Sequence, residues 1–274
     1  MYPTLHLGPW SVSTFLLALL AAFVVAGWVG VAQARVAVPD ESPAFVLDIA
    51  LWGGIAGLLG ARLWYAVVHL PELVGDPAEV LLHGGLVWYG GLLAGVIAGA
   101  WRYRQLGLPF SRLFDYGAAA VIIGHGIGRL GCFLVGDDYG TPTSSWVGIA
   151  FPHGAPPSTA GYLRAAGADV PATVPDAAVL RVHPTQLYEA FGALVIFAIV
   201  LRMSRRPFRP WTVFGTYALL YGVERFLLEI IRPKDDRFVH GLTVSQLASI
   251  ALALVGAWLV TRGRRAAVVA PLAR

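Results

Sequence analysis

The chain has 274 residues, of which 57% are hydrophobic and only 13% are charged, and its net charge at pH 7 is +4. About a quarter of the residues in a typical soluble domain are charged, so this composition excludes a water-soluble globular protein and indicates a polytopic membrane protein. The basic residues lie between apolar runs and not on one soluble face, which argues against a nucleic acid partner.

About seven apolar segments are long enough to cross a bilayer, which takes about 20 helical residues. We expect them to be helical, because an isolated strand in lipid leaves its backbone groups unpaired. The predicted helices cover, in chain order, about 10–33, 45–69, 84–101, 115–135, 185–203, 211–231 and 242–261. No basic residue precedes the first, so we predict a retained helix and not a cleaved signal peptide. The predicted fold class is an all-α polytopic membrane protein with one transmembrane domain over residues 1–274.

The distribution of lysine and arginine predicts which side of the membrane each connection faces. Twelve basic residues follow the first, third, fifth and seventh helices, and five lie in the other connections. The positive-inside rule therefore places the N-terminus outside and the C-terminus in the cytoplasm. The longest connection, about 136–183, then lies outside. Its scattered aromatic residues (Trp146, Phe151 and Tyr162) predict a small ordered extracytoplasmic cap between helices four and five.

The fourth predicted helix leads into residues 124–140, which combine apolar residues with His125, Arg129, Cys132 and Asp137. Ionisable groups at membrane depth are costly, so they are found where they line a cavity or take part in chemistry. A buried histidine satisfied by a partner is the simpler account of His125. A small apolar residue in the wall of a site is the simpler account of Cys132.

Arg129 in the fourth helix and Arg225 in the sixth are candidates for binding a phosphate group. A guanidinium stays charged when partly buried and forms forked hydrogen bonds with phosphate oxygens. The alternatives are an arginine that reaches the lipid headgroups and an arginine paired with a carboxylate for packing. Arg225 and Glu229 are four residues apart on one helical face, where the glutamate could orient the arginine. This helix is predicted to end at Pro233.

Two further motifs lie at helix starts. Residues 84–91 surround Tyr89 with paired glycines, which either form a packing seam or leave room for a bulky ligand. At the start of the fifth helix, Thr185 is predicted to cap the helix, and Gln186 and Glu189 occupy its first turns. A charged Glu189 at this position could simply stabilise the N-terminal end of the helix through its dipole.

Together these segments resemble the bacterial prolipoprotein diacylglyceryl transferases. The similar segments follow one another over nearly the whole chain: Gly60–Leu63, 84–91, Gly128–Gly140, His183–Glu189, Arg225–Glu229 and Ser245–Gln246. The resemblance implies transfer of the diacylglyceryl group of phosphatidylglycerol to the lipobox cysteine thiol of a preprolipoprotein, just after its signal peptide. A thioether forms and glycerol phosphate leaves. The resemblance also implies a multi-pass protein of the bacterial inner membrane that needs no metal or other cofactor.

By position, the resemblance also implies roles for individual residues. Arg129 and Arg225 are expected to bind the phosphate group of the lipid, and Glu229 is expected to support Arg225. The glycine of the signature turn is Gly140. The other residues expected to contact the substrates are Arg62, Gln186 and Glu189.

The chain departs from the family pattern at four positions, one of which is the tyrosine usual on the first helix, which is missing here. Tyr89 stands where the family has a histidine, Cys132 where it has an asparagine, and Asp137 where it has a glutamate. If the family's histidine deprotonates the incoming thiol, Tyr89 is a poor substitute, since a tyrosine hydroxyl has a pKa of about 10. His125 or Asp137 could then be the base. The alternatives are a paralogue with another acceptor and a lipid or anion transporter, although no internal repeat supports the transporter.

Overall fold

The structure is a computed structural model that describes residues 3–8, 10–37, 42, 44–83, 85, 87–107, 110–233, 237–239 and 241–263. These residues are mostly helical, and they also form three small two-stranded sheets that the all-α prediction did not include. They fall into two compact units. The first unit joins Met1–Val29 to Phe114–Arg274, and the second unit comprises Gly30–Leu113. The single domain over 1–274 stays a prediction.

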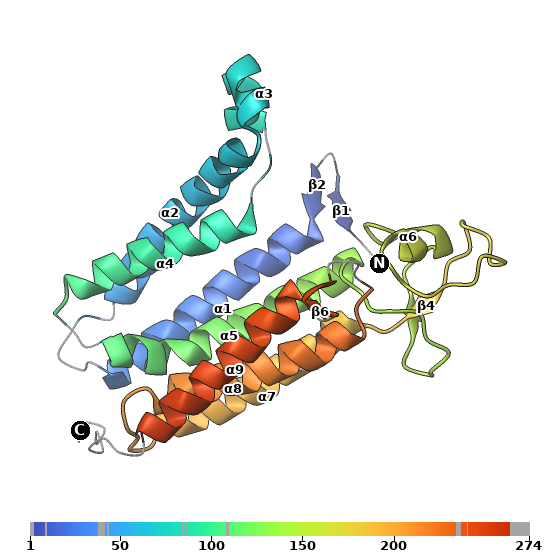
Figure 1. The fold of residues 1–274 in the computed structure, drawn as a ribbon. Helices are drawn as coiled ribbons and strands as arrows, with labels where there is room; N and C mark the ends of the chain where they lie inside the picture. Colours follow the sequence, from blue (N-terminus) through green and yellow to red (C-terminus); the bar gives the residue numbers. More distant parts are fainter. Residues whose placement is uncertain are drawn as a thin grey trace. The chain divides into compact units, whose positions relative to one another are not determined.

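Each of the seven predicted helices has a counterpart among the described residues (Figure 1). The counterparts are α1 (Thr14–Ala37), α2 (Ala44–Val68), α4 (Trp88–Arg104), α5 (Phe110–Val135), α7 (Thr185–Ser204), α8 (Thr212–Ile230) and α9 (Val244–Gly263). Three shorter helical segments had not been predicted: α3 (Leu70–Gly75), the π-helix Glu79–His83 and α6 (Ala160–Ala165).

Within the described ranges, five helices are long and apolar enough to cross a membrane: α1, α2, α5, α7 and α9, the last over Val244–Arg262. The other two predicted spans differ from these for separate reasons. Helix α4 has only 17 residues, whereas α8 carries Glu224, Arg225 and Glu229 in its second half. Charged residues at membrane depth mark functional sites more often than not, so α8 is where a site is expected.

Two predicted helices begin later than expected because a short strand precedes each of them. Trp10–Ser13 forms strand β2, which pairs with β1 (Thr4–Leu7), and α1 starts at Thr14. The Trp-Ser-Val-Ser sequence alternates apolar and polar residues, which is typical of a strand and not of a helix. In the same way, β6 (Leu242–Thr243) pairs with β5 (Arg237–Val239) before α9 begins.

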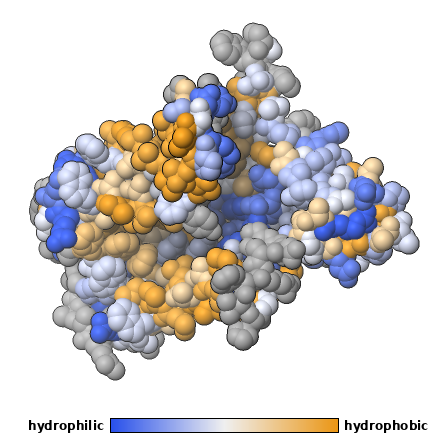
Figure 2. Space-filling view, turned by 45° about the horizontal axis from the view of Figure 1, so that its top comes forward, coloured by the Kyte–Doolittle hydropathy of each residue, from blue (hydrophilic) through white to orange (hydrophobic). Residues whose placement is uncertain are grey.

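In the first unit, α5, α7, α8 and α9 run side by side (Figure 1). Their interior holds a cluster of buried apolar residues: Val29, Ala119, Ile122, Ala193, Ile196, Val200 and Val213. Glycines let the backbones approach, since a Cβ added at Gly222 of α8 would lie 2.7 Å from the carbonyl oxygen of Ser249 in α9. Large apolar side chains lie on the exposed sides of the helices, as expected in lipid (Figure 2).

In the second unit, α2 and α4 pack along a seam of glycines. A Cβ added at Gly91 would lie 3.0 Å from the carbonyl oxygen of Gly57, and one added at Gly95 would lie 3.0 Å from that of Gly53. A side chain at either position would force the two helices apart. The packing account of these glycines is therefore confirmed.

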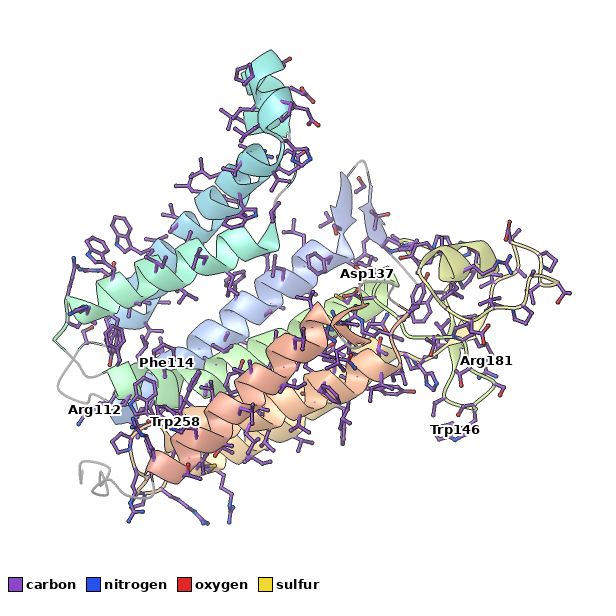
Figure 3. The ribbon with its side chains drawn as sticks, in the orientation of Figure 1. Arg112, Phe114, Asp137, Trp146, Arg181 and Trp258 are labelled. Atoms are coloured by element: carbon purple, nitrogen blue, oxygen red, sulfur yellow. The ribbon has the colours of Figure 1, made fainter. Side chains whose placement is uncertain are left out.

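The connection between α5 and α7, residues 136–183, is named the cap. In it, β3 (Ile149–Ala150) pairs with β4 (Arg181–Val182), and α6 contributes to a small core around the fully buried Phe151. Trp146, in contrast, is 87% exposed, and its carbonyl oxygen accepts a hydrogen bond from Arg181 (Figure 3). The cap is thus ordered around its own core, and its position outside the cytoplasm stays a prediction.

Asp115 links α5 to α8 at the ends of these helices that lie away from the cap. Its side chain is buried, and its carboxylate accepts hydrogen bonds from the backbone N–H groups of Trp211 (2.6 Å) and Phe214 (2.9 Å) at the start of α8. A carboxylate at this position satisfies donors left open at a helix N-terminus and interacts favourably with the helix dipole. It therefore fixes α8 against α5 before the charged part of α8 begins.

Replacing Asp115 with alanine is expected to lower the stability of the protein in detergent by about 1–3 kcal/mol, because two partly buried backbone donors lose their acceptor. The measurement is the thermal unfolding midpoint of the purified variant. Asp169→Ala, at an exposed residue of the cap, is the control. An unchanged midpoint in Asp115→Ala would show that other contacts hold the start of α8.

Candidate functional site

Arg129 lies at the centre of a polar cluster at the cap ends of α5, α7 and α8. Only 11% of its side chain is exposed. Its Nε lies 2.8 Å from Glu189 Oε2 in α7, and its Nη1 donates a hydrogen bond to Asp138 Oδ2 at 3.0 Å. Two carboxylates therefore accompany one buried guanidinium, as a buried charge requires.

Glu189 also contacts His125, which lies one helical turn before Arg129 on α5. The distance between His125 Nε2 and Glu189 Oε1 is 3.1 Å. The imidazole packs edge-on against the Tyr221 ring of α8, with 5.2 Å between the ring centroids. His125 is only partly buried, with 28% of its side chain exposed, and it is paired with a carboxylate. A catalytic part for His125 stays a prediction.

Arg225 is held by a residue of its own helix. Its Nη2 lies 2.8 Å from Glu229 Oε2, one turn later in α8, which confirms the predicted pair. The other oxygen of Glu229 accepts a hydrogen bond from Thr243 Oγ1 at 3.2 Å. The residue before α9 thus fixes the glutamate that orients the arginine.

Asp138 and Arg232 complete the cluster, and neither had been predicted as a site residue. They form an ion pair with each other, while Asp138 also binds Arg129. Asp138 adopts a left-handed backbone conformation (φ +59°) in the turn after α5. Arg232 follows Glu229 by three residues, so helical spacing was a signal that could have identified it.

Two guanidinium nitrogens of the cluster have no hydrogen-bond acceptor. Nη2 of Arg129 and Nη1 of Arg225 are shielded from solvent and have no hydrogen-bond partner within the described part of the chain. A buried donor without an acceptor is rare in folded proteins and costs about 1–3 kcal/mol, or more when it is charged. A ligand that carries several negatively charged oxygens would satisfy both nitrogens.

The first turn of α7 holds the loop that follows α5. Gln186 Nε2 donates a hydrogen bond to the carbonyl oxygen of Asp137 at 2.5 Å, and Thr185 Oγ1 donates to that of Asp138 at 2.7 Å. The predicted helix cap at Thr185 is therefore wrong. Thr185 is the first helical residue, and its hydroxyl binds the neighbouring loop because a carbonyl oxygen lies within reach.

Gly140 lies in the same loop, at a point where no side chain fits. An added Cβ would lie 2.7 Å from the carbonyl oxygen of Ile231 and 2.9 Å from the Cβ of His183. The Gly140 N–H donates a hydrogen bond to the carbonyl oxygen of His183 at 2.8 Å. Close packing alone accounts for a glycine here, and a part in substrate binding stays a prediction.

Cys132 lies in the last turn of α5. Asp137 lies just beyond the end of this helix, at the cap (Figure 3). The Cys132 sulfur is buried and lies 3.5 Å from Arg129 Nη1, which suits a residue in the wall of the site. Asp137 follows α5, and one of its carboxylate oxygens is shielded from solvent without a hydrogen-bond partner in the described residues. Burial raises the pKa of this carboxyl group.

Arg62 and Tyr89 belong to the second unit. Arg62 Nη1 donates a hydrogen bond to the carbonyl oxygen of Gly85 at 3.0 Å. Tyr89 lies in the first turn of α4, and its side chain lies outside the part of the chain that the structure describes. Contacts of Arg62 and Tyr89 with a substrate stay predictions.

Three carboxylates of the cluster are engaged with arginines. Glu189, Glu229 and Asp138 each contact at least one guanidinium. Over the ranges that the structure describes, no group of three or more His, Cys, Asp or Glu side chains is arranged to hold a metal ion. The arrangement is thus suited to binding an anion.

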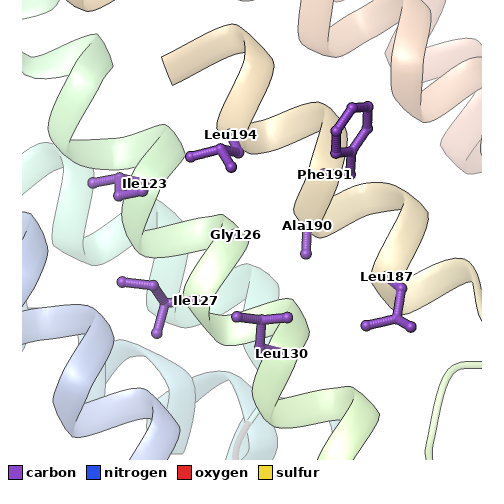
Figure 4. Close-up of a pocket in the computed structure, with 8 residues that line it drawn as sticks. All are labelled: Ile123, Gly126, Ile127, Leu130, Leu187, Ala190, Phe191 and Leu194. Atoms are coloured by element: carbon purple, nitrogen blue, oxygen red, sulfur yellow. The ribbon is translucent and has the colours of Figure 1, made fainter. Parts of the chain in front are cut away.

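An apolar pocket of about 290 Å³ lies between α5 and α7 (Figure 4). It is lined by Ile123, Gly126, Ile127, Leu130, Leu187, Ala190, Phe191 and Leu194. Leu130 directly follows Arg129 in α5, and Ala190 directly follows Glu189 in α7. A molecule with a charged group and hydrocarbon chains could therefore contact both the cluster and the pocket.

Comparisons with known proteins point to one family. The sequence model of the family described as prolipoprotein diacylglyceryl transferase matches residues 3–262. A phosphatidylglycerol–prolipoprotein diacylglyceryl transferase of Xanthomonas oryzae pv. oryzae (strain PXO99A) is 34% identical, with 97% of this chain and 92% of that protein aligned. A protein of the same name from Symbiobacterium thermophilum is 34% identical, with 94% of this chain and 92% of that protein aligned.

Replacing Asp137 with asparagine is expected to raise stability at neutral pH. Because the pKa of this carboxyl is higher in the folded chain than in the unfolded chain, ionisation destabilises the fold. This destabilisation is absent below the unfolded pKa of about 4 and develops as the pH rises through the folded pKa. Thermal unfolding in detergent at about pH 4 and pH 7 measures the difference in stability between Asp137→Asn and the unmodified protein. An equal difference between Asp137→Asn and the unmodified protein at both pH values would contradict the expectation.

Proposed function

The chain belongs to the prolipoprotein diacylglyceryl transferase family, and we propose that it catalyses the family's reaction at the cluster around Arg129 and Arg225. As a phosphatidylglycerol–prolipoprotein diacylglyceryl transferase, it moves the diacylglyceryl group of phosphatidylglycerol to the lipobox cysteine thiol of a preprolipoprotein. The sulfur forms a thioether with the glyceryl carbon, and glycerol phosphate is the leaving group.

The observation that supports this site most directly is the pair of guanidinium nitrogens that have no acceptor among the residues that the structure describes. One belongs to Arg129 in α5 and the other to Arg225 in α8. Guanidinium N–H groups match the oxygens of a phosphate in geometry and charge. As the bond to the glyceryl carbon breaks, negative charge grows on the phosphate, and donors already in place stabilise that transition state.

Carboxylates hold the two arginines before the lipid arrives. Glu189 contacts Arg129 and Glu229 contacts Arg225, and in each case another nitrogen of the guanidinium has no acceptor within the described ranges. Prepositioned donors need little reorganisation during the reaction. Glu229 therefore supports Arg225, as the family pattern implied. The further residues proposed to shape or contact the substrate site are Gln186, Glu189, Gly140 and Arg62.

Three side chains are candidates for removing the thiol proton: Tyr89, His125 and Asp137. Tyr89 occupies the position of the family's histidine, but a group with a pKa of about 10 is poorly matched to neutral pH. His125 is oriented by Glu189, as in a histidine–carboxylate pair. Asp137 lies on the cap side of Arg129, where it would have to reach past the phosphate.

The apolar pocket between α5 and α7 suits an acyl chain of the lipid substrate. Its lining residues are all apolar, and two of them directly follow Arg129 and Glu189 in the sequence. Each CH₂ group that a chain buries there contributes about 0.8 kcal/mol. The pocket would thus hold part of the diacylglyceryl group while the arginines hold the phosphate.

We also propose seven spans in the bacterial inner membrane, with α4 and α8 added to the five apolar helices. The N-terminus lies outside, the C-terminus lies in the cytoplasm, and the cap lies outside. The arginine cluster is then near the outer leaflet, where glycerol phosphate can leave into water. Phosphatidylglycerol and the signal peptide of the preprolipoprotein both enter sideways from the lipid bilayer. The pairing of Arg225 with Glu229 makes a membrane position for α8 possible.

Alanine at Arg129 or at Arg225 is expected to slow glycerol phosphate release from phosphatidylglycerol, with a lipobox peptide as acceptor, by at least about 10²–10³-fold. Lysine at either position should restore little of the lost rate, because one ammonium group cannot bind a carboxylate and a phosphate together as the forked guanidinium does. Arg202→Ala, at an exposed residue at the other end of α7, is the matched control.

Activity that survives both alanine substitutions would place the phosphate site elsewhere in the protein. Lipid movement between vesicles without any glycerol phosphate release would favour a transporter and refute the transferase.

Phenylalanine in place of Ala190 is expected to fill the apolar pocket. The KM for a long-chain phosphatidylglycerol should then rise roughly tenfold, while a short-chain phosphatidylglycerol is used almost normally. Leu254→Phe, on an exposed face of α9, is the control. An equal loss with both lipids would contradict a role of the pocket in holding an acyl chain.

A further inference from the structure

Glu224 is a buried carboxyl group of α8 that the phosphate site does not use. Both of its oxygens are shielded from solvent, and neither has a hydrogen-bond partner within the residues that the structure describes. Glu189 and Glu229, in comparison, each contact an arginine. A carboxyl group with two unsatisfied oxygens is costly in an apolar helix bundle, which indicates that it is kept for a function.

The carboxyl group of Glu224 occupies the seam between α7 and α8. A Cβ added at Gly192 of α7 would overlap it, so the glycine leaves the space that the carboxyl fills. The titratable groups around it are Glu189 of α7, Arg225, Tyr217 and Tyr221 of α8 and, in contact with Glu189 and Tyr221, His125 of α5. Glu224 thus lies in the same cluster as the proposed phosphate site.

Within this cluster, Glu224 lies further from the cap than the phosphate site does. Helix α7 begins at the cap with Thr185. Gly192 is therefore three residues beyond Glu189, which is about 4.5 Å at the helical rise of 1.5 Å per residue. The Glu224 carboxyl thus lies beside a residue of α7 that is almost one turn further from the cap than Glu189.

The chemistry of the transfer places the acceptor thiol on this deeper side. The acyl chains of a bound phosphatidylglycerol run from its phosphate toward the middle of the bilayer, away from the cap. The attacked glyceryl carbon lies between the phosphate and the chains, and the sulfur must approach it opposite the leaving oxygen. The thiol is then below the arginines, on the side of Glu224, whereas Asp137 lies on the cap side.

We propose that Glu224 is the base that takes the proton of the acceptor thiol, an inference that rests on the proposed function. The S–H bond breaks, and the proton passes to a Glu224 oxygen. A sulfur electron pair forms the C–S bond while the C–O bond breaks. The electron pair of the C–O bond leaves on the phosphate oxygen, in the phosphate group held by Arg129 and Arg225. The proton then passes from Glu224 to the departing glycerol phosphate or to water, which restores the carboxylate. His125 acts through Glu189, which it helps to hold against Arg129.

Glutamine at position 224 keeps the size of the side chain and its fit against Gly192, but it cannot take a proton. With a cysteine lipobox peptide, Glu224→Gln is expected to lower kcat for glycerol phosphate release by at least about 100-fold, with little change in the KM for phosphatidylglycerol. Glu72→Gln, at an exposed glutamate of α3, is the matched control. An unchanged kcat in Glu224→Gln would overturn the proposal.

An acceptor peptide that is already ionised distinguishes two roles for Glu224: that of a base and that of a residue that only maintains the structure. In a lipobox peptide with selenocysteine in place of cysteine, the selenol is ionised at neutral pH and needs no base. Glu224→Gln should then recover to within about tenfold of the unmodified protein. If Glu224→Gln is equally impaired with both peptides, the residue is structural and the proposal fails.

The same two peptides distinguish Glu224 from His125 and from the phosphate site. Recovery of His125→Gln, but not of Glu224→Gln, with the selenocysteine peptide would assign the base to His125 and overturn the proposal. Arg129→Ala should stay inactive with both peptides, because the phosphate is not held. Activity of Arg129→Ala with either peptide would refute the proposed phosphate site, a failure separate from that of Glu224.

Discussion

Two guanidinium groups buried among apolar helices determine which parts of this protein must meet. Burying a charge costs several kcal/mol unless carboxylates and hydrogen bonds offset it. Glu189 and Asp138 do so for Arg129, and Glu229 does so for Arg225. These carboxylates come from α7, from the loop after α5 and from α8. The carboxylates that offset the cost of burying the two arginines thus also bring α5, α7 and α8 together at the site.

The remaining contacts keep these partners at fixed positions. Asp115 secures the start of α8 against α5, far from the cluster. At the other end, Thr185 and Gln186 hold the backbone of the loop that carries Asp138. Gly140 lets that loop pass close to the end of α8. Both ends of the helices are fixed, so the free nitrogens of the arginines can meet a phosphate without large rearrangement.

The helices could be predicted from hydropathy because a bilayer-length apolar run has few other outcomes. Strand β2 was missed because four alternating residues beside a long apolar run give a weak signal. In the site, the Arg225–Glu229 pair could be predicted, since helical spacing places both on one face. The contact between Arg129 and Glu189 joins residues 60 positions apart, so the spacing of residues along the chain could not predict it. The capping error at Thr185 has a related cause, since the sequence does not show which carbonyl its hydroxyl will reach.

The ion pair of α8 also bears on how the protein is made. A charged residue near the centre of a helix opposes its insertion into the membrane by about 2.5–3.5 kcal/mol. Arg225 and Glu229 lie one turn apart in the same helix, so their pair needs no residue of another helix to form. In the proposed membrane position of α8, the helix is then presented to the bilayer with two of its charges already neutralising each other. Loss of Glu229 would thus reduce the amount of correctly inserted protein as well as the activity of each molecule.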